Sequence, residues 1–228
     1  MIIALCGQKG GTGKTTTAVS LAVEWSVRGR SVLLVDTDGQ RSALTWADVA
    51  AERGAEHVPP TIALGEQLRR QLPPHLPGRD VVVIDCPPAH GERQRAALMV
   101  ADLAVIPAVA DATEVWALGE TRRIVDEALA MREALRVALL VTRKDRRTQL
   151  GAQARQVLGQ LGLPVLEAEL SRRITYPEAL VAGLGPTTYD PASVAAREVR
   201  RLATELELLG GLPPLPRPAP SKARKEAP

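Results

Sequence analysis

Residues 2–16 read Ile-Ile-Ala-Leu-Cys-Gly-Gln-Lys-Gly-Gly-Thr-Gly-Lys-Thr-Thr, and this stretch decides the fold class. Its apolar start, residues 2–6, is typical of a short strand that is buried on both faces. Four glycines then permit a tight turn in which consecutive backbone N–H groups converge on an anion. Apolar residues at helical spacing follow from Thr16 onward, so the positive end of a helix would face the same anion. The stretch therefore predicts a phosphate-binding loop between a strand and a helix.

Two side chains at the end of this loop carry the expected chemistry. The general pattern G-x-x-x-x-G-K-[ST] is met by Gly13-Lys14-Thr15, but Gln8 stands where the pattern opens on glycine. In this pattern the lysine reaches the β- and γ-phosphates and the hydroxyl binds Mg²⁺. The alternative, a glycine-rich turn with a solvated lysine, is disfavoured by the strand–loop–helix setting. We expect the phosphates to be held by Gly10, Gly11, Thr12, Gly13, Lys14, Thr15 and Thr16.

The rest of the chain alternates between strand-like and helix-like segments. Short runs rich in β-branched residues suit buried strands, and apolar residues three and four apart suit helices. The expected strands are 2–6, 31–35, 81–84, 103–107, 136–141 and 165–170, with 61–64 as a short extra strand. The expected helices are 16–28, 41–53, 93–100, 114–135, 149–161 and 191–209. This alternation predicts an α/β fold, a doubly wound and mostly parallel sheet flanked by helices.

Length and composition limit the number of domains that the chain can form. The 228 residues suffice for one domain with a sizeable core, which we expect to be a phosphate-loop domain over residues 1–209. Residues 210–228 are rich in proline and have little to bury, so we expect a disordered basic tail. This tail carries the whole net charge of +3, because it holds four basic residues and one acidic residue. Nucleic-acid binding must therefore be argued from local patches.

Several protein classes are disfavoured by composition. Aromatic residues make up 2% of the chain and phenylalanine is absent, so a base-stacking surface for single strands cannot form. Two cysteines, Cys6 and Cys86, are too few for a disulfide framework or a four-thiolate metal site, which indicates a reducing compartment. The three histidines lie in loop-like segments, and no run approaches the ~18 apolar residues of a membrane span. We expect a cytoplasmic protein without membrane attachment.

Three acidic residues follow two of the expected strands. Asp36 and Asp38 come after residues 31–35, and Asp85 ends the strand at 81–84 before two prolines that stop sheet pairing. Ligands of open α/β sheets bind at these carboxyl ends. Asp85 is typical of a Walker B acid that lies near Mg²⁺ through a water molecule. The alternative for Asp36 and Asp38 is capping of the helix at 41–53.

The segment Lys9-Gly10-Gly11-Thr12-Gly13-Lys14-Thr15-Thr16 resembles the deviant Walker A box of the ParA/MinD family of ATPases. The resemblance implies that ATP and Mg²⁺ are the ligands and that Lys9 belongs to the ATP-binding set. In that family this lysine crosses a homodimer interface and contacts the phosphates bound by the other protomer. A second cation neutralises triphosphate charge only when two chains meet. The alternative is an exposed loop charge.

The resemblance also implies roles for the acids. By this match Asp38 positions or activates the attacking water, and Asp36 and Asp85 support the Mg²⁺ shell from a second layer, behind Thr15. Lys9, Lys14 and Asp38 are then the catalytic residues. Gly39 stands where the family usually has proline, which loosens the loop that holds Asp38.

The C-terminal part is similar to small ParA partition ATPases, which lack an N-terminal helix-turn-helix domain. We expect this form because the phosphate-loop strand starts at residue 2. The resemblance implies non-specific binding of double-stranded DNA by the ATP-bound dimer, nucleoid association, and a ParB-like adaptor or cargo protein. Candidate DNA contacts are Arg172, Arg173, Arg197, Arg200 and Arg201, with a solvated basic helix face as the alternative. Thr142 stands where relatives often place an adenine-binding asparagine.

Two other functions stay open from the sequence. A metabolic phosphate-loop enzyme, such as a synthetase that phosphorylates a carboxylate substrate, would have a small-molecule pocket and turn over without DNA. A nucleotide-controlled scaffold with negligible hydrolysis is the other, because Gly39 departs from the family pattern. The prolines after residue 210 disfavour the amphipathic membrane helix of MinD-like relatives.

Overall fold

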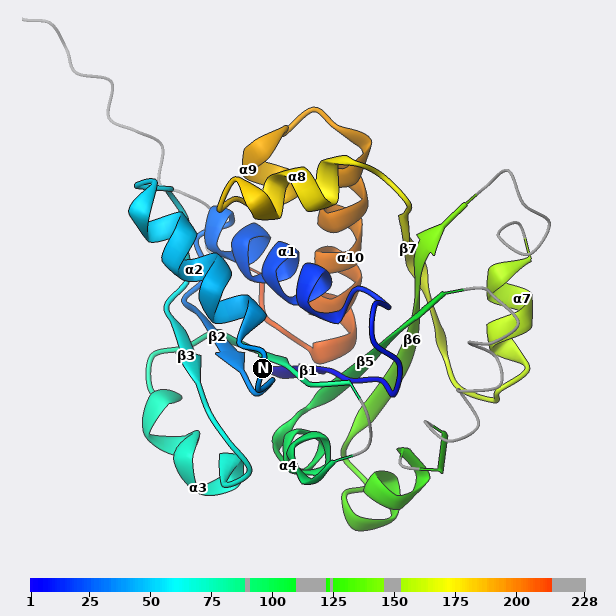
Figure 1. Ribbon diagram of the computed structural model, residues 1–228. Helices are drawn as coiled ribbons and strands as arrows, with labels where there is room; N and C mark the ends of the chain where they lie inside the picture. Colours follow the sequence, from blue (N-terminus) through cyan, green and yellow to red (C-terminus); the bar gives the residue numbers. More distant parts are fainter. Residues whose placement is uncertain (89–90, 110–121, 124, 146–152, 215–228) are drawn as a thin grey trace, which may run out of the picture.

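The computed structural model describes residues 1–88, 91–109, 122–123, 125–145 and 153–214. Its centre is a seven-stranded sheet in the order β3-β2-β4-β1-β5-β6-β7, and the paired strands are all parallel (Figure 1). The strands are β1 (Ile2–Leu5), β2 (Val32–Asp36), β3 (Thr61–Ala63), β4 (Val81–Asp85), β5 (Leu103–Val109), β6 (Arg136–Lys144) and β7 (Val165–Ser171). The predicted fold class is confirmed, including the short extra strand.

Helices cover both faces of this sheet. Helices α1, α2, α8, α9 and α10 lie on one face, and α3, α4 and α7 lie on the other (Figure 1). Their bounds are α1 (Lys14–Val27), α2 (Ser42–Glu52), α3 (Leu68–Gln71), α4 (Glu92–Val100), α7 (Ala154–Gly159), α8 (Thr175–Val181), α9 (Pro186–Tyr189) and α10 (Val194–Gly210), with a 3-10 turn η1 (Pro73–His75). Residues 125–131 are also helical.

The strands read as continuous apolar runs because both of their faces are covered. Every residue of β2 and β4 is buried, and alternate residues of each strand enter two separate cores. In β4, Val81 and Val83 join the core under α1, whereas Val82 and Ile84 join the core on the opposite face. A strand that is buried on both sides has no polar alternation.

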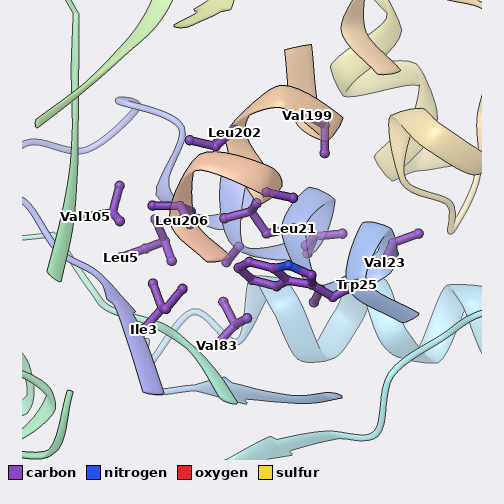
Figure 2. Packing of buried hydrophobic residues seen from close by; sticks show 14 of the residues in the cluster. Ile3, Leu5, Leu21, Val23, Trp25, Val83, Val105, Val199, Leu202 and Leu206 are labelled. Atoms are coloured by element: carbon purple, nitrogen blue, oxygen red, sulfur yellow. The ribbon is translucent and has the colours of Figure 1, made fainter. Parts of the chain in front are cut away.

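The larger core joins α1 to α10. Trp25 of α1 is 0% exposed and lies among Leu21, Val83 and Leu206, as Figure 2 shows. The amphipathic α10 presents Val199, Leu202 and Leu206 to this core at three- and four-residue spacing. The tryptophans at 25 and 46 are therefore packing residues.

Strand order determines where the site lies. From the central β1 the chain runs to β2 and β3 on one side and later to β5, β6 and β7 on the other (Figure 1). Ligands of such sheets bind at the carboxyl ends where the strand order reverses. Asp85 pairs in register with both Leu5 and Asp36, so the loops after β1, β2 and β4 leave the sheet at the same level.

Some predicted elements differ in extent. Helix α1 begins two residues earlier than predicted, and α10 begins at Val194, after a turn that Ser193 caps through the Ala196 N–H at 3.1 Å. The predicted helix 114–135 ends at residue 131 in the described part, and 149–152 lie outside it. Helices α8 and α9 were not predicted, because helices of seven and four residues show little periodicity. The predicted tail begins at residue 210, but Gly210 ends α10 and Leu212 packs against the larger core, and residues 215–228 lie outside the described residues.

Candidate functional site

The phosphate loop lies between β1 and α1, as the sequence predicted. Gly11 and Gly13 have φ angles of +80° and +92°, in the left-handed region that favours glycine. Gly13 directly precedes α1, so Lys14, Thr15 and Thr16 form the first turn of the helix. Free N–H groups and the positive helix end therefore meet at the loop.

Lys14 lies inside the loop. Its side chain is 6% exposed, and Nζ donates a hydrogen bond to the Lys9 carbonyl oxygen at 2.8 Å. Burial lowers the pKa of Lys14, and the nearby Asp85 acts in the opposite direction. A buried ammonium group within a turn of free amides is arranged for an anion with more than one charge.

Asp85 is a buried carboxyl group at the end of β4. It is 0% exposed, and neither of its oxygens meets hydrogen-bond geometry with any donor in the described part of the chain. Burial raises the pKa of Asp85 to about 7, while the nearby Thr15 hydroxyl and Lys14 lower it. An orphaned buried carboxyl group is costly unless a cation or its water shell approaches. Asp85 and Thr15 therefore fit a Mg²⁺ ion.

Asp36 anchors the start of α2. Its Oδ2 accepts hydrogen bonds from the Ala43 and Leu44 N–H groups at 2.9 and 3.1 Å, and its Oδ1 accepts one from the Asp38 N–H at 2.9 Å. Burial raises the pKa of Asp36, and these three hydrogen bonds lower it. The capping alternative therefore holds for Asp36, whose contribution to a Mg²⁺ shell would be indirect.

Asp38 lies in the loop that Asp36 anchors and lines the large pocket beside the phosphate loop. Its Oδ1 accepts the Gln40 N–H at 3.0 Å. Arg93 of α4, which sequence reasoning missed, donates from NH1 to the Thr37 carbonyl at 3.1 Å and lies beside Gly39. This contact supports the loop where the usual proline is missing.

The carboxyl end of β6 holds the phosphate loop from the opposite side. Thr142 is 2% exposed, and its hydroxyl lies 2.8 Å from the Thr12 carbonyl oxygen and 3.2 Å from that of Ala108. Arg143 donates from NH1 to the Gly11 carbonyl at 2.8 Å. The hydroxyl hydrogen of Thr142 is thus used by the backbone, although this residue stands where relatives often place an adenine-binding asparagine. No spacing rule in the sequence points to this contact between distant segments.

A pocket of about 940 Å³ opens over the phosphate loop. One side is the loop with Lys14, Thr15 and Asp38, and the other is formed by the end of β7 and by α8, including Tyr176 and Leu180. The volume suits a nucleotide, with apolar surface beyond the phosphates.

Lys9 lies at an adjoining hollow of about 270 Å³. It shares this hollow with Gly10, Val109, Arg143 and Arg172, among others. The described residues that line the large pocket do not include the Lys9 side chain. Lys14 therefore lines the large pocket and Lys9 lines the hollow beside it, and the two spaces share Gly10, Gly11, Arg143 and Arg172.

The five candidate DNA-contacting arginines fall into two groups. Arg172 and Arg173 line the large pocket, and Arg173 pairs with Glu198 of α10 at 3.1 Å. Arg197, Arg200 and Arg201 lie on α10, where Arg200 also donates to the Pro191 carbonyl at 2.8 Å. Arg197 and Arg201 are exposed, one turn apart. Ion pairing of Arg173 was not foreseeable from spacing alone.

The two cysteines meet beneath the loop. Both are buried free thiols, and their Sγ atoms are 3.6 Å apart, next to Gly7 and Asp85 respectively. The hydrogen bond to Cys6, followed by burial, raises the pKa of Cys86 well above its usual value. Cys86 is thus a poor nucleophile, and it packs in the core on the α4 face of the sheet.

The described helices and acidic side chains bear on membrane crossing and on metal binding. None of the described helices combines the length and the apolar character that crossing a bilayer requires. Nor do three His, Cys, Asp or Glu side chains within the described ranges gather as a ready-made metal site. A Mg²⁺ ion here would need oxygens from its nucleotide.

Known proteins share this sequence pattern and this architecture. Residues 3–214 match the CobQ/CobB/MinD/ParA nucleotide binding domain family (CbiA). The chain is 32% identical to the chromosome-partitioning ATPase Soj of Thermus thermophilus, over 90% of this chain and 94% of Soj. It is 30% identical to the maintenance of carboxysome distribution protein A of Halothiobacillus neapolitanus, over 80% of this chain and 84% of that protein.

A solved structure extends the likeness to enzymes. Cobyrinic acid a,c-diamide synthase of Mycobacterium smegmatis, with bound ADP and magnesium, superposes with a TM-score of 0.69 at 23% identity, covering 95% of this chain and 99% of that one. This likeness concerns the fold. The family match covers nearly the whole described chain, and it agrees with the loop, the two strand-end acids and the parallel sheet. The chain therefore belongs to the CobQ/CobB/MinD/ParA family of nucleotide-binding domains.

Proposed function

We propose that this chain is a ParA-type positioning ATPase, in which ATP and Mg²⁺ bind at the phosphate loop and close a homodimer. The observation that carries the proposal is the phosphate loop itself, in which Lys14 is buried near the carboxyl group of Asp85 and Lys9 lines the adjoining hollow. The named activity of Soj, an ATPase of chromosome partitioning, supports it.

In this proposal Lys14 exchanges the Lys9 carbonyl for β- and γ-phosphate oxygens, and Thr15 supplies its hydroxyl to Mg²⁺. Asp85 holds the ion's water shell, which would relieve its own burial. The family's fold neighbours bind ADP with magnesium, as the synthase from M. smegmatis does. When bound, the ion would neutralise charge on the phosphates, and Asp38 would orient the attacking water.

In this proposal Lys9 contacts the phosphates of the nucleotide that the other protomer binds. Lys9 lines the side hollow and is absent from the lining of the large pocket, which agrees with a contact to a nucleotide bound by a second protomer. A lysine brought to a triphosphate from a partner neutralises charge only in the dimer. ATP would then control the oligomeric state.

The ATP-bound dimer would bind double-stranded DNA non-specifically through Arg197, Arg200 and Arg201, with Arg172 and Arg173 near the nucleotide. Doubling a basic patch doubles the phosphates that it contacts and steepens the salt dependence. An adaptor or cargo protein, ParB-like, would stimulate slow hydrolysis and release the dimer. We propose a cytoplasmic, nucleoid-associated location, with the residues that follow α10 as a basic tail.

Sedimentation with a non-hydrolysable ATP analogue tests the switch. Wild type should sediment as a dimer, Lys9→Ala should bind the analogue yet remain monomeric, and Lys14→Ala should lose the analogue. A wild type that stays monomeric at saturation would refute the proposal.

Gel shifts in ATP and in ADP, across a salt series, test DNA binding. We expect DNA to be retarded at moderate salt only when the protein is bound to ATP. The double variant Arg200→Glu/Arg201→Glu should weaken this retardation. The matched control is Arg69→Glu/Arg70→Glu, which makes the same charge change at exposed positions of α3 on the other face of the sheet. Equal loss in both double variants would argue against an α10 surface.

A carboxylate-phosphorylating synthetase is the second candidate, favoured by the shared fold of the M. smegmatis synthase and by the apolar extension of the large pocket towards Tyr176 and Leu180. It predicts phosphate release that depends on a small carboxylate and not on DNA. A scaffold with negligible hydrolysis would show neither dependence. A phosphate-release assay with each addition separates the three.

A further inference from the structure

Side-chain donors hold three carbonyl oxygens of the phosphate loop. Lys14 donates a hydrogen bond to the carbonyl oxygen of Lys9. Arg143 donates to that of Gly11, and Thr142 donates to that of Thr12. Two of these donors are consecutive residues at the end of β6, about 130 residues away in sequence. They act on consecutive peptide units of the loop.

Holding a carbonyl fixes the direction of the N–H in the same peptide unit. In a trans peptide the two groups point in opposite directions, and the described chain has no cis peptide bond. The carbonyls of Gly11 and Thr12 point towards β6, so the N–H groups of Thr12 and Gly13 point away from it. Among the described residues, none accepts a hydrogen bond from either N–H. Unpaired, aligned amides form an anion nest.

The backbone at Arg143 is unusual in the same place. Arg143 has a φ of +50°, in the left-handed region that non-glycine residues avoid. Such conformations persist where surrounding contacts require them and cluster at ligand sites. Here the conformation accompanies the contact between the guanidinium group and Gly11.

We propose that Thr142 and Arg143 are positioning residues that aim the Thr12 and Gly13 amides at the nucleotide's phosphates. This inference rests on the proposed function, because it assumes that a triphosphate occupies the loop. Charged and hydroxyl donors on the carbonyl side also polarise the peptide and strengthen its N–H as a donor. Thr142 thus acts on phosphate affinity and does not read the base.

Affinities for ATP, GTP and inorganic tripolyphosphate distinguish a Thr142 that positions phosphate-binding amides from one that recognises the base. Thr142→Val keeps the shape and removes the donor, so we expect Kd to rise about tenfold, by the same factor, for all three ligands. Thr142→Ser restores the hydroxyl and should stay within about twofold of wild type. A loss for ATP with tripolyphosphate unchanged would overturn the proposal in favour of base recognition.

Arg143 is tested by affinity and stability together. Arg143→Gly removes the guanidinium group and relieves the backbone, so its urea midpoint without ligand should rise while its Kd for tripolyphosphate rises about threefold to tenfold. Arg143→Ala should weaken binding equally without the gain in stability. Unchanged affinity in both variants, with tight binding by wild type, would overturn the positioning role alone. Failure of wild type to bind any triphosphate would overturn the proposed function as well.

Discussion

The buried carboxyl group of Asp85 should make the ligand-free protein less stable as the pH rises. Its pKa is raised to about 7 in the folded state, against about 3.9 in an unfolded chain. Between these values the folded state keeps a proton that the unfolded state has lost. The free energy of unfolding therefore falls with increasing pH across this window, by at most about 4 kcal/mol for a difference of about three pKa units.

Asp85→Asn removes this dependence because an amide does not titrate. We expect the variant to equal wild type near pH 4 and to be more stable by about 2–4 kcal/mol at pH 8, a large fraction of a typical domain's stability. Urea unfolding between pH 4 and pH 8.5, without nucleotide or Mg²⁺, measures this difference in the free energy of unfolding. Asp48→Asn, at an exposed position of α2, is the matched control.

The same variant should behave oppositely with ligand. Mg²⁺ and an ATP analogue stabilise the folded state in proportion to their affinity, and Asp85→Asn loses the charge that holds the ion's water shell. The increase in urea midpoint on adding both ligands should therefore be smaller for Asp85→Asn than for wild type. A variant no more stable than wild type at pH 8 would refute the reasoning about burial.

Three further outcomes follow from the structure. Asp36→Ala leaves the N–H groups of Ala43 and Leu44 without their acceptor, so urea unfolding should show a loss of about 2 kcal/mol. Leu206→Ala opens a cavity beside Trp25 and should cost about 2–5 kcal/mol in the same assay, whereas Leu208→Ala, 78% exposed, should cost little. Asp38→Ala should lower phosphate release by about a hundredfold while the dimer still forms with ATP, and unchanged release would remove Asp38 from the hydrolytic step.

The sequence alone determined the fold class and the phosphate loop. Both signals are local: continuous apolar runs mark strands covered on both faces, and the glycines with Lys14 and Thr15 mark an anion cradle within a few residues. Asp85 was also identified locally, since it ends a strand and precedes two prolines. Short-range patterns are sufficient where structure depends on neighbours in the chain.

Only the tertiary structure decided how distant segments act on this loop. Strand order brought the end of β6 to the phosphate loop, where Thr142 donates to the Thr12 carbonyl. Packing buries the Asp85 carboxyl group without a hydrogen-bond partner among the described residues. It also places Asp36 where its carboxylate accepts hydrogen bonds from the start of α2. Helices α8 and α9, too short to leave a periodic signal, complete the face above α1. Desolvation and long-range hydrogen bonds depend on packing, which sequence spacing does not encode.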